Sequence, residues 1–253
     1  MELIFTVLTL FPKQISDFME TSIVGRATKK GLLDIRCVDI RDHADNDHGK
    51  VDDTLYGGGK GMLLACEPVY RAWNSVLSGG DVKPHTVYLS PKGKVLNQDK
   101  VIELSQHKHL VLLCGHYEGI DQRVLDSVVD EEISIGDYVL TGGEVAACVV
   151  IDAVSRMIPG VLPDASAYEN ESHMHGTLES PHYTKPDEWN GVEVPEVLRN
   201  GHHAEIEKWR RLEGLYLTYK NRKDLFEKLE LAPDEWAYII QREGQKPREM
   251  PEK

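Results

Sequence analysis

The sequence predicts an α/β fold, a mostly parallel sheet with helices on both faces, followed by a small all-helical domain. Two observations lead to this fold class. Short β-rich apolar runs alternate with helical segments up to about residue 158, as in parallel sheets covered on both faces. From residue 195 onward the apolar spacing is helical, and a polar stretch separates the two regions. We therefore expect a first domain at 1–162, a linker at 163–173, a helical domain at 174–246 and a tail at 247–253.

The strands of the sheet are predicted where apolar and β-branched residues cluster or alternate. These runs are Ile4–Leu10, Leu33–Ile40, His85–Leu89, Leu110–Cys114 and Ile133–Ile135. Between the second and third runs, a polar stretch with five Asp and two His indicates a loop over Arg41–Asp53. That loop leads to a glycine-rich segment, Tyr56–Met62.

The helices are predicted from cap residues and from apolar spacing. Pro12 suits the first turn of a helix over Lys13–Thr21, and Asn97 can cap a helix that runs to Gln106. Apolar residues at helical spacing indicate the remaining helices, which are Glu67–Leu77, Gly143–Met157, His202–Glu213, Leu215–Leu231 with interruptions, and Pro233–Glu243.

Composition limits the classes of protein to which the chain can belong. The chain has 253 residues and no run of 18 apolar residues, so we expect no membrane-spanning helix. The N-terminus lacks the basic region and cleavage site of a signal peptide. The four cysteines form no CxxC pair, which favours free thiols in a reducing compartment. We therefore expect a cytoplasmic protein.

The charge distribution separates an acidic bulk from one basic segment. A net charge of −13 argues against nucleic-acid binding by the chain as a whole. The segment Arg199–Lys223 nevertheless carries seven Lys or Arg against three Glu, a local net charge of +4. Charge alone leaves two interpretations open, a solvated helix face and a surface that binds phosphate groups.

Several common site motifs are absent from the sequence. Lys60 is followed by Gly61 and not by Ser or Thr, so the glycine-rich segment is no Walker loop. Met62 stands where a dinucleotide fingerprint needs glycine, which leaves a plain turn as the alternative. The histidines and cysteines lack metal-site spacing, and no Gly-x-Ser-x-Gly elbow occurs. We therefore predict no metal cluster and no serine nucleophile.

Three loops after predicted strands form the candidate small-molecule site, namely Leu89–Gly93, Cys114–Gly119 and Ile135–Gly143. Open α/β sheets bind ligands at the carboxyl ends of their strands. The main-chain groups and apolar side chains of these loops suit a flat purine ring. Glu118 and Asp137 disfavour phosphate and tolerate a cationic ligand. The site therefore favours S-adenosylmethionine over ATP.

A series of motifs runs in order through nearly the whole chain. Its members are Val51–Asp53, Tyr56–Met62, Leu89–Gly93, Cys114–Asp121, Ser134–Glu144, Arg156, Pro159–Leu162, Pro181–Pro186, Val194–Leu198 and Gly201–His203. Each motif alone is weak, but together they are specific. In this combination the chain resembles the bacterial tRNA (guanine-N1)-methyltransferases of the SPOUT class.

The resemblance implies a deep trefoil knot in the C-terminal part of the α/β domain, whose loops bind S-adenosylmethionine as methyl donor. Carried over by motif, the residues that would contact this cofactor are Tyr88, Leu89, Ser90, Pro91, Gly115, Tyr117, Glu118, Gly119, Ser134, Ile135, Gly136, Tyr138, Leu140, Gly142 and Gly143.

The implied reaction is methylation of N1 of the guanine immediately 3′ of the anticodon in tRNA. Guanine N1 carries a proton at neutral pH, so a base must remove it, and the charge that builds on O6 needs a cation. The resemblance assigns the second role to Arg156 and the first to a linker carboxylate. Glu171 stands where the family has Asp, and Glu169 competes because the motif leaves the linker register open. A second family aspartate corresponds to Glu179.

The resemblance also implies partners. It implies a homodimer whose active site is completed across the interface, and magnesium dependence as a family trait, so Mg²⁺ is an open expectation. Expected tRNA contacts are Asp52, Gly57, Gly58, Gly59, Glu179, Lys208, Arg210 and Arg211. Two alternatives stay open, a SPOUT RNA methyltransferase of other position specificity and a non-catalytic RNA-binding module.

Overall fold

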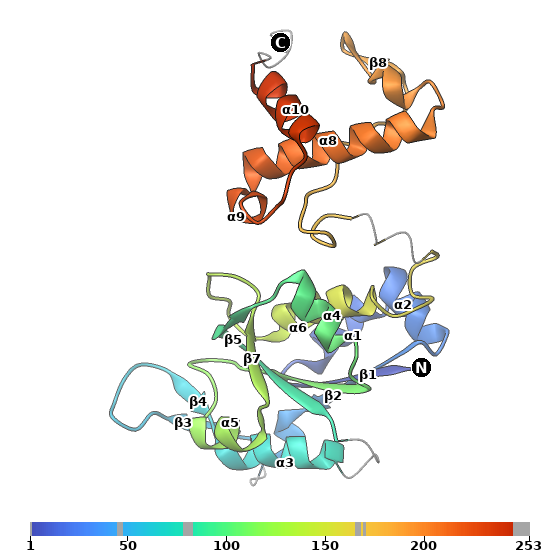
Figure 1. Ribbon diagram of the computed structural model, residues 1–253. Helices are drawn as coiled ribbons and strands as arrows, with labels where there is room; N and C mark the ends of the chain where they lie inside the picture. Colours follow the sequence, from blue (N-terminus) through green and yellow to red (C-terminus); the bar gives the residue numbers. More distant parts are fainter. Residues whose placement is uncertain (1, 45–47, 78–82, 165–167, 169–170, 245–253) are drawn as a thin grey trace. The chain divides into compact units, whose positions relative to one another are not determined.

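The computed structural model describes residues 2–44, 48–77, 83–164, 168 and 171–244. The chain divides into two compact units, Met1–Ala165 and Ser166–Lys253. The first unit is built on a sheet and the second is mainly helical, as Figure 1 shows. Each unit is described by itself below.

A five-stranded sheet forms the centre of the first unit. Its strands are β1 Leu3–Thr9, β2 Leu33–Asp39, β5 His85–Val95, β6 His109–Cys114 and β7 Glu131–Ser134. Their order is β2-β1-β6-β5-β7, and every neighbouring pair is parallel. All six residues of β6 are buried, as expected of a central strand covered on both faces. The predicted parallel sheet is therefore confirmed.

Helices cover both faces of this sheet, as predicted (Figure 1). One face carries α1 Pro12–Met19, α2 Ser22–Lys29, α4 Gln98–Leu104 and α6 Glu144–Ser155, which share one apolar core with the sheet. The other face carries α3 Cys66–Leu77 and α5 Gln122–Val128, with a second core. Because side chains alternate along a strand, β1, β5 and β6 supply buried residues to both cores. Each fully buried Leu or Ile contributes about 1.5–3 kcal/mol.

Local signals placed most of these helices. Asn97 caps α4, since its Oδ1 accepts a hydrogen bond of 2.9 Å from the backbone N–H of Lys100. Pro12 occupies the first turn of α1. The helix α2 was not predicted, because its mixed composition shows no clear helical pattern. It is stabilised by Val24 and Ala27, which are buried in the core that the helix shares with the sheet.

The predicted loop over Arg41–Asp53 is wrong at both ends. A 3₁₀ helix, η1, occupies Ile40–His43, and β3 begins at Asp52. Strand β3, Asp52–Thr54, pairs antiparallel with β4, Met62–Leu64. The three consecutive glycines lie in the connection of this hairpin, and all three have positive φ, at 84°, 80° and 137°. Only glycine adopts such a series without strain.

The segment Ser90–Gly93 is not the end of a strand. Strand β5 continues to Val95, and its pairing with β7 shifts register between Leu89 and Lys94. The candidate loop is therefore a bulge inside β5. At Gly93 a side chain would collide with the backbone of Glu132 on β7. The pairing of β5 with β7, which resumes at Lys94, therefore requires glycine at this position.

The second unit contains α8 His203–Asn221, α9 Lys223–Phe226 and α10 Pro233–Glu243 around a small core of Leu215, Phe226 and Ile239. The predicted helix break at Gly214 is wrong, because α8 runs through this residue. The unit is also not purely helical. Besides the short 3₁₀ helix η2, Glu196–Leu198, it has a hairpin of β8 Glu188–Trp189 and β9 Val192–Glu193. Its Asn190–Gly191 turn, with φ of 50° and 75°, was the overlooked signal.

No helix within the described ranges has both the length and the apolar character needed to cross a membrane. The four cysteines are free, with Cys114 and Cys148 buried.

Two histidines are expected to make the stability of the protein depend on pH. Burial lowers the pKa of His107 and of His109, with further lowering from His85 and Arg36 respectively. The fold therefore prefers the neutral rings. Since the unfolded chain has an ordinary histidine pKa of about 6.5, stability should be lost as the pH falls below that value towards the folded pKa values.

Urea unfolding at pH 7.5 and pH 5.5 measures this loss, within a range where most carboxylates stay ionised. The variant with both His107→Gln and His109→Gln should lose less stability between the two pH values than the wild type. Equal losses in the two proteins would assign the pH dependence to other groups.

Candidate active site

A cavity of about 240 Å³ lies beside the bulge of β5 and the carboxyl ends of β6 and β7. All fifteen residues expected to contact a cofactor line it. Eight more line it that the sequence reasoning did not name, although most of them lie within or next to the same three loops: Lys92, His116, Ile120, Leu125, Ile133, Val139, Thr141 and Ala146. The fold thus brings three segments together at the edge where open α/β sheets bind ligands.

The first wall of the cavity is the loop that follows β6. The backbone N–H of Gly119 donates to the carbonyl of His116 at 3.0 Å, and Tyr117 takes a positive φ of 57° to make this turn. The hairpin holds the loop from outside, because the N–H of Glu118 donates to Met62 at 3.1 Å. A methyl group at Gly115 would lie 2.8 Å from the hydroxyl of Tyr88, so the Tyr88 side chain would have to move to make room for any other residue there.

Tyr88 lines the cavity next to Gly115. Its side chain is buried, and burial together with the charge of Glu132 raises its pKa to about 12. The hydroxyl therefore stays protonated at neutral pH and can act as a hydrogen-bond donor.

The second wall is the loop between β7 and α6. The hydroxyl of Ser134 donates to the carbonyl of Gly136 at 2.9 Å and accepts the N–H of the same residue at 3.2 Å. Tyr138 closes the turn, since its hydroxyl donates to the carbonyl of Ile135 at 3.2 Å. Several main-chain groups are thereby fixed before any ligand arrives, which lowers the entropy cost of binding.

The two walls are joined directly. The N–H of Gly143 donates to the carbonyl of Gly115 at 2.9 Å, and His116 forms an antiparallel bridge with Gly142. A methyl group at Gly143 would lie 2.7 Å from the Cα of Cys114. This close approach of two backbones is the reason for glycine at Gly143.

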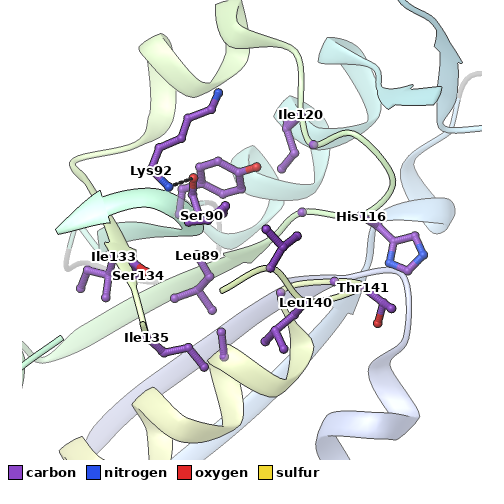
Figure 2. A pocket seen from close by; sticks show the side chains of 18 of the residues that line it. Leu89, Ser90, Lys92, His116, Ile120, Ile133, Ser134, Ile135, Leu140 and Thr141 are labelled. Atoms are coloured by element: carbon purple, nitrogen blue, oxygen red, sulfur yellow. Dashed lines mark hydrogen bonds between the residues drawn. The ribbon is translucent and has the colours of Figure 1, made fainter. Parts of the chain in front are cut away.

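The lining is apolar in one part and polar in another. Figure 2 shows Leu89, Ile135 and Leu140 gathered around one part of the pocket, with Ser90 and Lys92 in another part. The Oγ of Ser90 accepts the backbone N–H of Lys92 at 3.1 Å. Apolar side chains facing fixed main-chain groups fit a purine ring, and the carboxylate of Glu118 fits a cationic centre. The residues present therefore fit S-adenosylmethionine.

Arg156 lies at the C-terminal end of α6 and is not among the residues that line this cavity. Its backbone N–H donates to the carbonyl of Asp152 at 3.3 Å, and its side chain is half-buried. Asp52 begins β3, and the three glycines lie in the same exposed hairpin. These predicted residues therefore belong to the same unit as the cavity but do not line the cavity.

A second cavity, of about 470 Å³, lies within the second unit. Four predicted residues line it together, Glu171, Glu179, Arg210 and Arg211. The backbone N–H of Glu179 donates to the Oγ of Ser172 at 3.1 Å, which brings the two glutamate segments side by side. Glu169, the competing base, lies outside the residues that the structure describes.

The basic segment is partly neutralised by its neighbours. Arg210 pairs with Glu207 at 2.7 Å and Arg211 with Glu235 at 3.0 Å, while Lys208 lies 3.8 Å from Asp234. These pairs are solvent-exposed for the most part, and such pairs are worth about 0–1 kcal/mol. Phosphate groups can therefore replace the carboxylates at little cost. Within the described ranges, no cluster of three His, Cys, Asp or Glu could hold a metal ion.

Comparison with known proteins shows the family. A sequence profile described as tRNA (Guanine-1)-methyltransferase TrmD matches residues 3–228. Among curated relatives, the tRNA (guanine-N(1)-)-methyltransferase of Ruminiclostridium cellulolyticum is 54% identical over 225 residues, which are 89% of this chain and 97% of the relative. That of Alkaliphilus metalliredigens is 47% identical over 93% of this chain and 96% of its own. That of Clostridioides difficile is 46% identical over 88% and 97%. The chain belongs to the tRNA (guanine-1)-methyltransferase family.

Proposed function

We propose that the protein transfers a methyl group from S-adenosylmethionine to N1 of the guanine immediately 3′ of the anticodon in tRNA. The observation that supports this best is the convergence of all fifteen expected cofactor residues on one cavity in a chain of this family. S-adenosylmethionine, when bound, supplies an electrophilic methyl group on sulfur.

The proton chemistry falls to the chain's own residues. As the N1–methyl bond forms and the sulfur–methyl bond breaks, the N1 proton passes to the carboxylate of Glu171. Negative charge that develops on O6 is stabilised by the guanidinium of Arg156. Glu171 lines the same cavity of the second unit as Arg210 and Arg211.

We infer the family's trefoil knot in the C-terminal part of the first unit. The close packing of Gly143 on Cys114 and Gly115 supports this inference, because a knot requires the two loops to cross tightly.

We infer further that the protein is a homodimer that pairs through α6. This helix is apolar on almost every side, and a helix of that kind is normally buried all round. Yet Val145 is 50% exposed and Val149 is 42% exposed. Arg156 follows at i+7 from Val149 and so lies on the same face. Val139 and Leu140, in the loop before α6, are exposed as well, and exposed apolar side chains in this number favour an interface.

Val149→Glu is expected to convert the dimer to a monomer and to abolish methyl transfer. A charge buried in the interface without a partner costs several kcal/mol. Sedimentation velocity at micromolar concentration measures the mass. The matched control is Ile102→Glu on α4, an apolar position of similar exposure at 37%, which should leave mass and activity unchanged. A wild-type monomer with full activity would contradict the inferred interface.

The tRNA is proposed to bind the basic face of α8 and the exposed β3–β4 hairpin. Lys208, Arg210 and Arg211 contribute charge on α8. The hairpin presents Asp52 and the glycines Gly57, Gly58 and Gly59. A local basic face allows an acidic protein to bind RNA, because the interaction is screened beyond about 8–10 Å.

Mass spectrometry of treated tRNA tests the proposed function. The protein is incubated with S-adenosylmethionine and an unmodified transcript, and the products are digested to nucleosides. The expected product is 1-methylguanosine, absent when adenine replaces the guanine 3′ of the anticodon. A 2′-O-methyl nucleoside would instead favour a SPOUT enzyme of other specificity. An absence of calorimetric heat with S-adenosylmethionine would favour the RNA-binding module, and EDTA in the same assay tests the expected Mg²⁺.

A further inference from the structure

One extended segment of the second unit lies against the middle of α8, where the helix has no side chain. Gly214 is the only glycine in α8, and it is buried. A methyl group at Gly214 would lie 2.6 Å from the carbonyl oxygen of Leu178. Glycine is a poor helix former, so its place in mid-helix needs a reason. The close approach of the Leu178 backbone supplies that reason.

One turn further along, Thr218 holds the same residue by a hydrogen bond. Its side chain is fully buried, with 0% exposed. The Oγ1 of Thr218 accepts the backbone N–H of Leu178 at 2.8 Å and donates to the carbonyl of Gly214 at 2.7 Å. A threonine hydroxyl can donate once and accept, so both capacities are used here. We call Gly214 and Thr218 together the α8 seat.

The α8 seat lies next to the carboxylates that the proposed reaction needs. Glu179 follows Leu178 directly, and its backbone N–H bonds to Ser172, the neighbour of Glu171. A second backbone bond, from the N–H of His173 to the carbonyl of Thr177 at 2.8 Å, closes the turn between the two glutamates. A shift of Leu178 must therefore move both carboxylates relative to the arginines of α8.

We propose that Gly214 and Thr218 are positioning residues, which hold Glu171 in the geometry from which the guanine proton is removed. This proposal rests on the proposed function with Glu171 as base. Neither residue needs to touch the RNA or the methyl donor. Their contribution is geometric, and a misplacement of about 1 Å in a catalytic group can cost roughly 100-fold in rate.

The test compares Gly214→Ala and Thr218→Val with Thr218→Ser, which keeps the hydroxyl. A second control is Gly244→Ala, where the new methyl would lie 3.6 Å from the nearest backbone oxygen, an ordinary contact. Single-turnover methyl transfer should fall by about 10-fold to 100-fold in the first two variants and stay at the wild-type rate in both controls. The Kd for S-adenosylmethionine and the KM for tRNA should not change. Hydrogen exchange of the Leu178 amide should accelerate in Thr218→Val and not in Thr218→Ser.

The variant that combines Gly214→Ala with Thr218→Val separates an effect on positioning from a general loss of stability. Both substitutions disturb one contact, so their effects on rate should be less than additive. Wild-type rates in Gly214→Ala and Thr218→Val, despite faster exchange at Leu178, would overturn the proposal while leaving the proposed function intact. A loss of activity that appears as a raised KM and a lowered unfolding temperature would also overturn it, in favour of a merely structural role. A wild-type protein that forms no 1-methylguanosine would instead overturn the proposed function.

Discussion

Replacing Glu171 with Gln is expected to lower the single-turnover rate of methyl transfer by about 100-fold or more, with the Kd for S-adenosylmethionine unchanged. The amide keeps the shape of the side chain and cannot accept the N1 proton. Among the described residues, all those that line the 240 Å³ cavity belong to the first unit, so the substitution leaves the walls of this cavity intact. Rapid-quench methylation of a tRNA transcript measures the rate, and calorimetry measures the affinity.

The matched control is Glu179→Gln, in the same cavity as Glu171. If Glu171 is the base, this variant should retain far more activity, and Glu171→Asp should recover part of the lost rate. Near-normal single-turnover rates in Glu171→Gln would transfer the role to another linker carboxylate, and Glu169→Gln would then be tested in the same assay.

Gly143→Ala is expected to weaken binding of S-adenosylmethionine by about 10-fold to 100-fold, because forcing a methyl group into a packed site costs about 1–3 kcal/mol. The new methyl would lie 2.7 Å from the Cα of Cys114. A side-chain rotation cannot relieve this contact, because the Cα of Cys114 and the Cα of residue 143 both belong to the backbone. The wall after β6 and the wall before α6 must therefore separate, and the bond from Gly143 to Gly115 is lost.

Calorimetric titration with S-adenosylmethionine measures this loss, and Gly244→Ala serves as the control for a glycine with room for a methyl group. Circular dichroism establishes that both variants are folded. An unchanged Kd in a folded Gly143→Ala protein would mean that the joined walls do not form the binding site. It would contradict the assignment of the 240 Å³ cavity to the methyl donor.

Local patterns were sufficient for the sheet and for most of the lining of the candidate site. The alternation of apolar runs with helical segments predicts a parallel sheet, and parallel strands bring their carboxyl ends to one edge. The loops after β6 and β7 could therefore be placed together without knowledge of any contact. The strand β5 shows the limit of this reasoning. Its bulge at Ser90–Gly93 has the sequence pattern of a strand end, because the resumed pairing of Lys94 with Ile133 on β7 joins residues 39 positions apart.

Glycines mark most clearly where local reasoning failed. Gly214 predicts a helix break when it is judged by propensity alone, yet α8 continues because the Leu178 backbone occupies the space of the missing side chain. The hairpin around Gly57–Gly59 and the short strands β8 and β9 are similar cases, since a few residues form a strand only when a partner strand is present.

By itself the sequence determined the fold class, the family and the three segments that line the 240 Å³ cavity, and it indicated which residue types are candidates for the proton chemistry. These follow from periodicity and from motifs, which are properties of neighbouring residues. Only the tertiary structure decided which of those residues share a cavity. It joined Gly143 to Gly115, brought Glu171 beside Glu179, and revealed the α8 seat that holds their segment. The physical reason is that such approaches are set by the packing of backbones far apart in the chain, which no local pattern encodes.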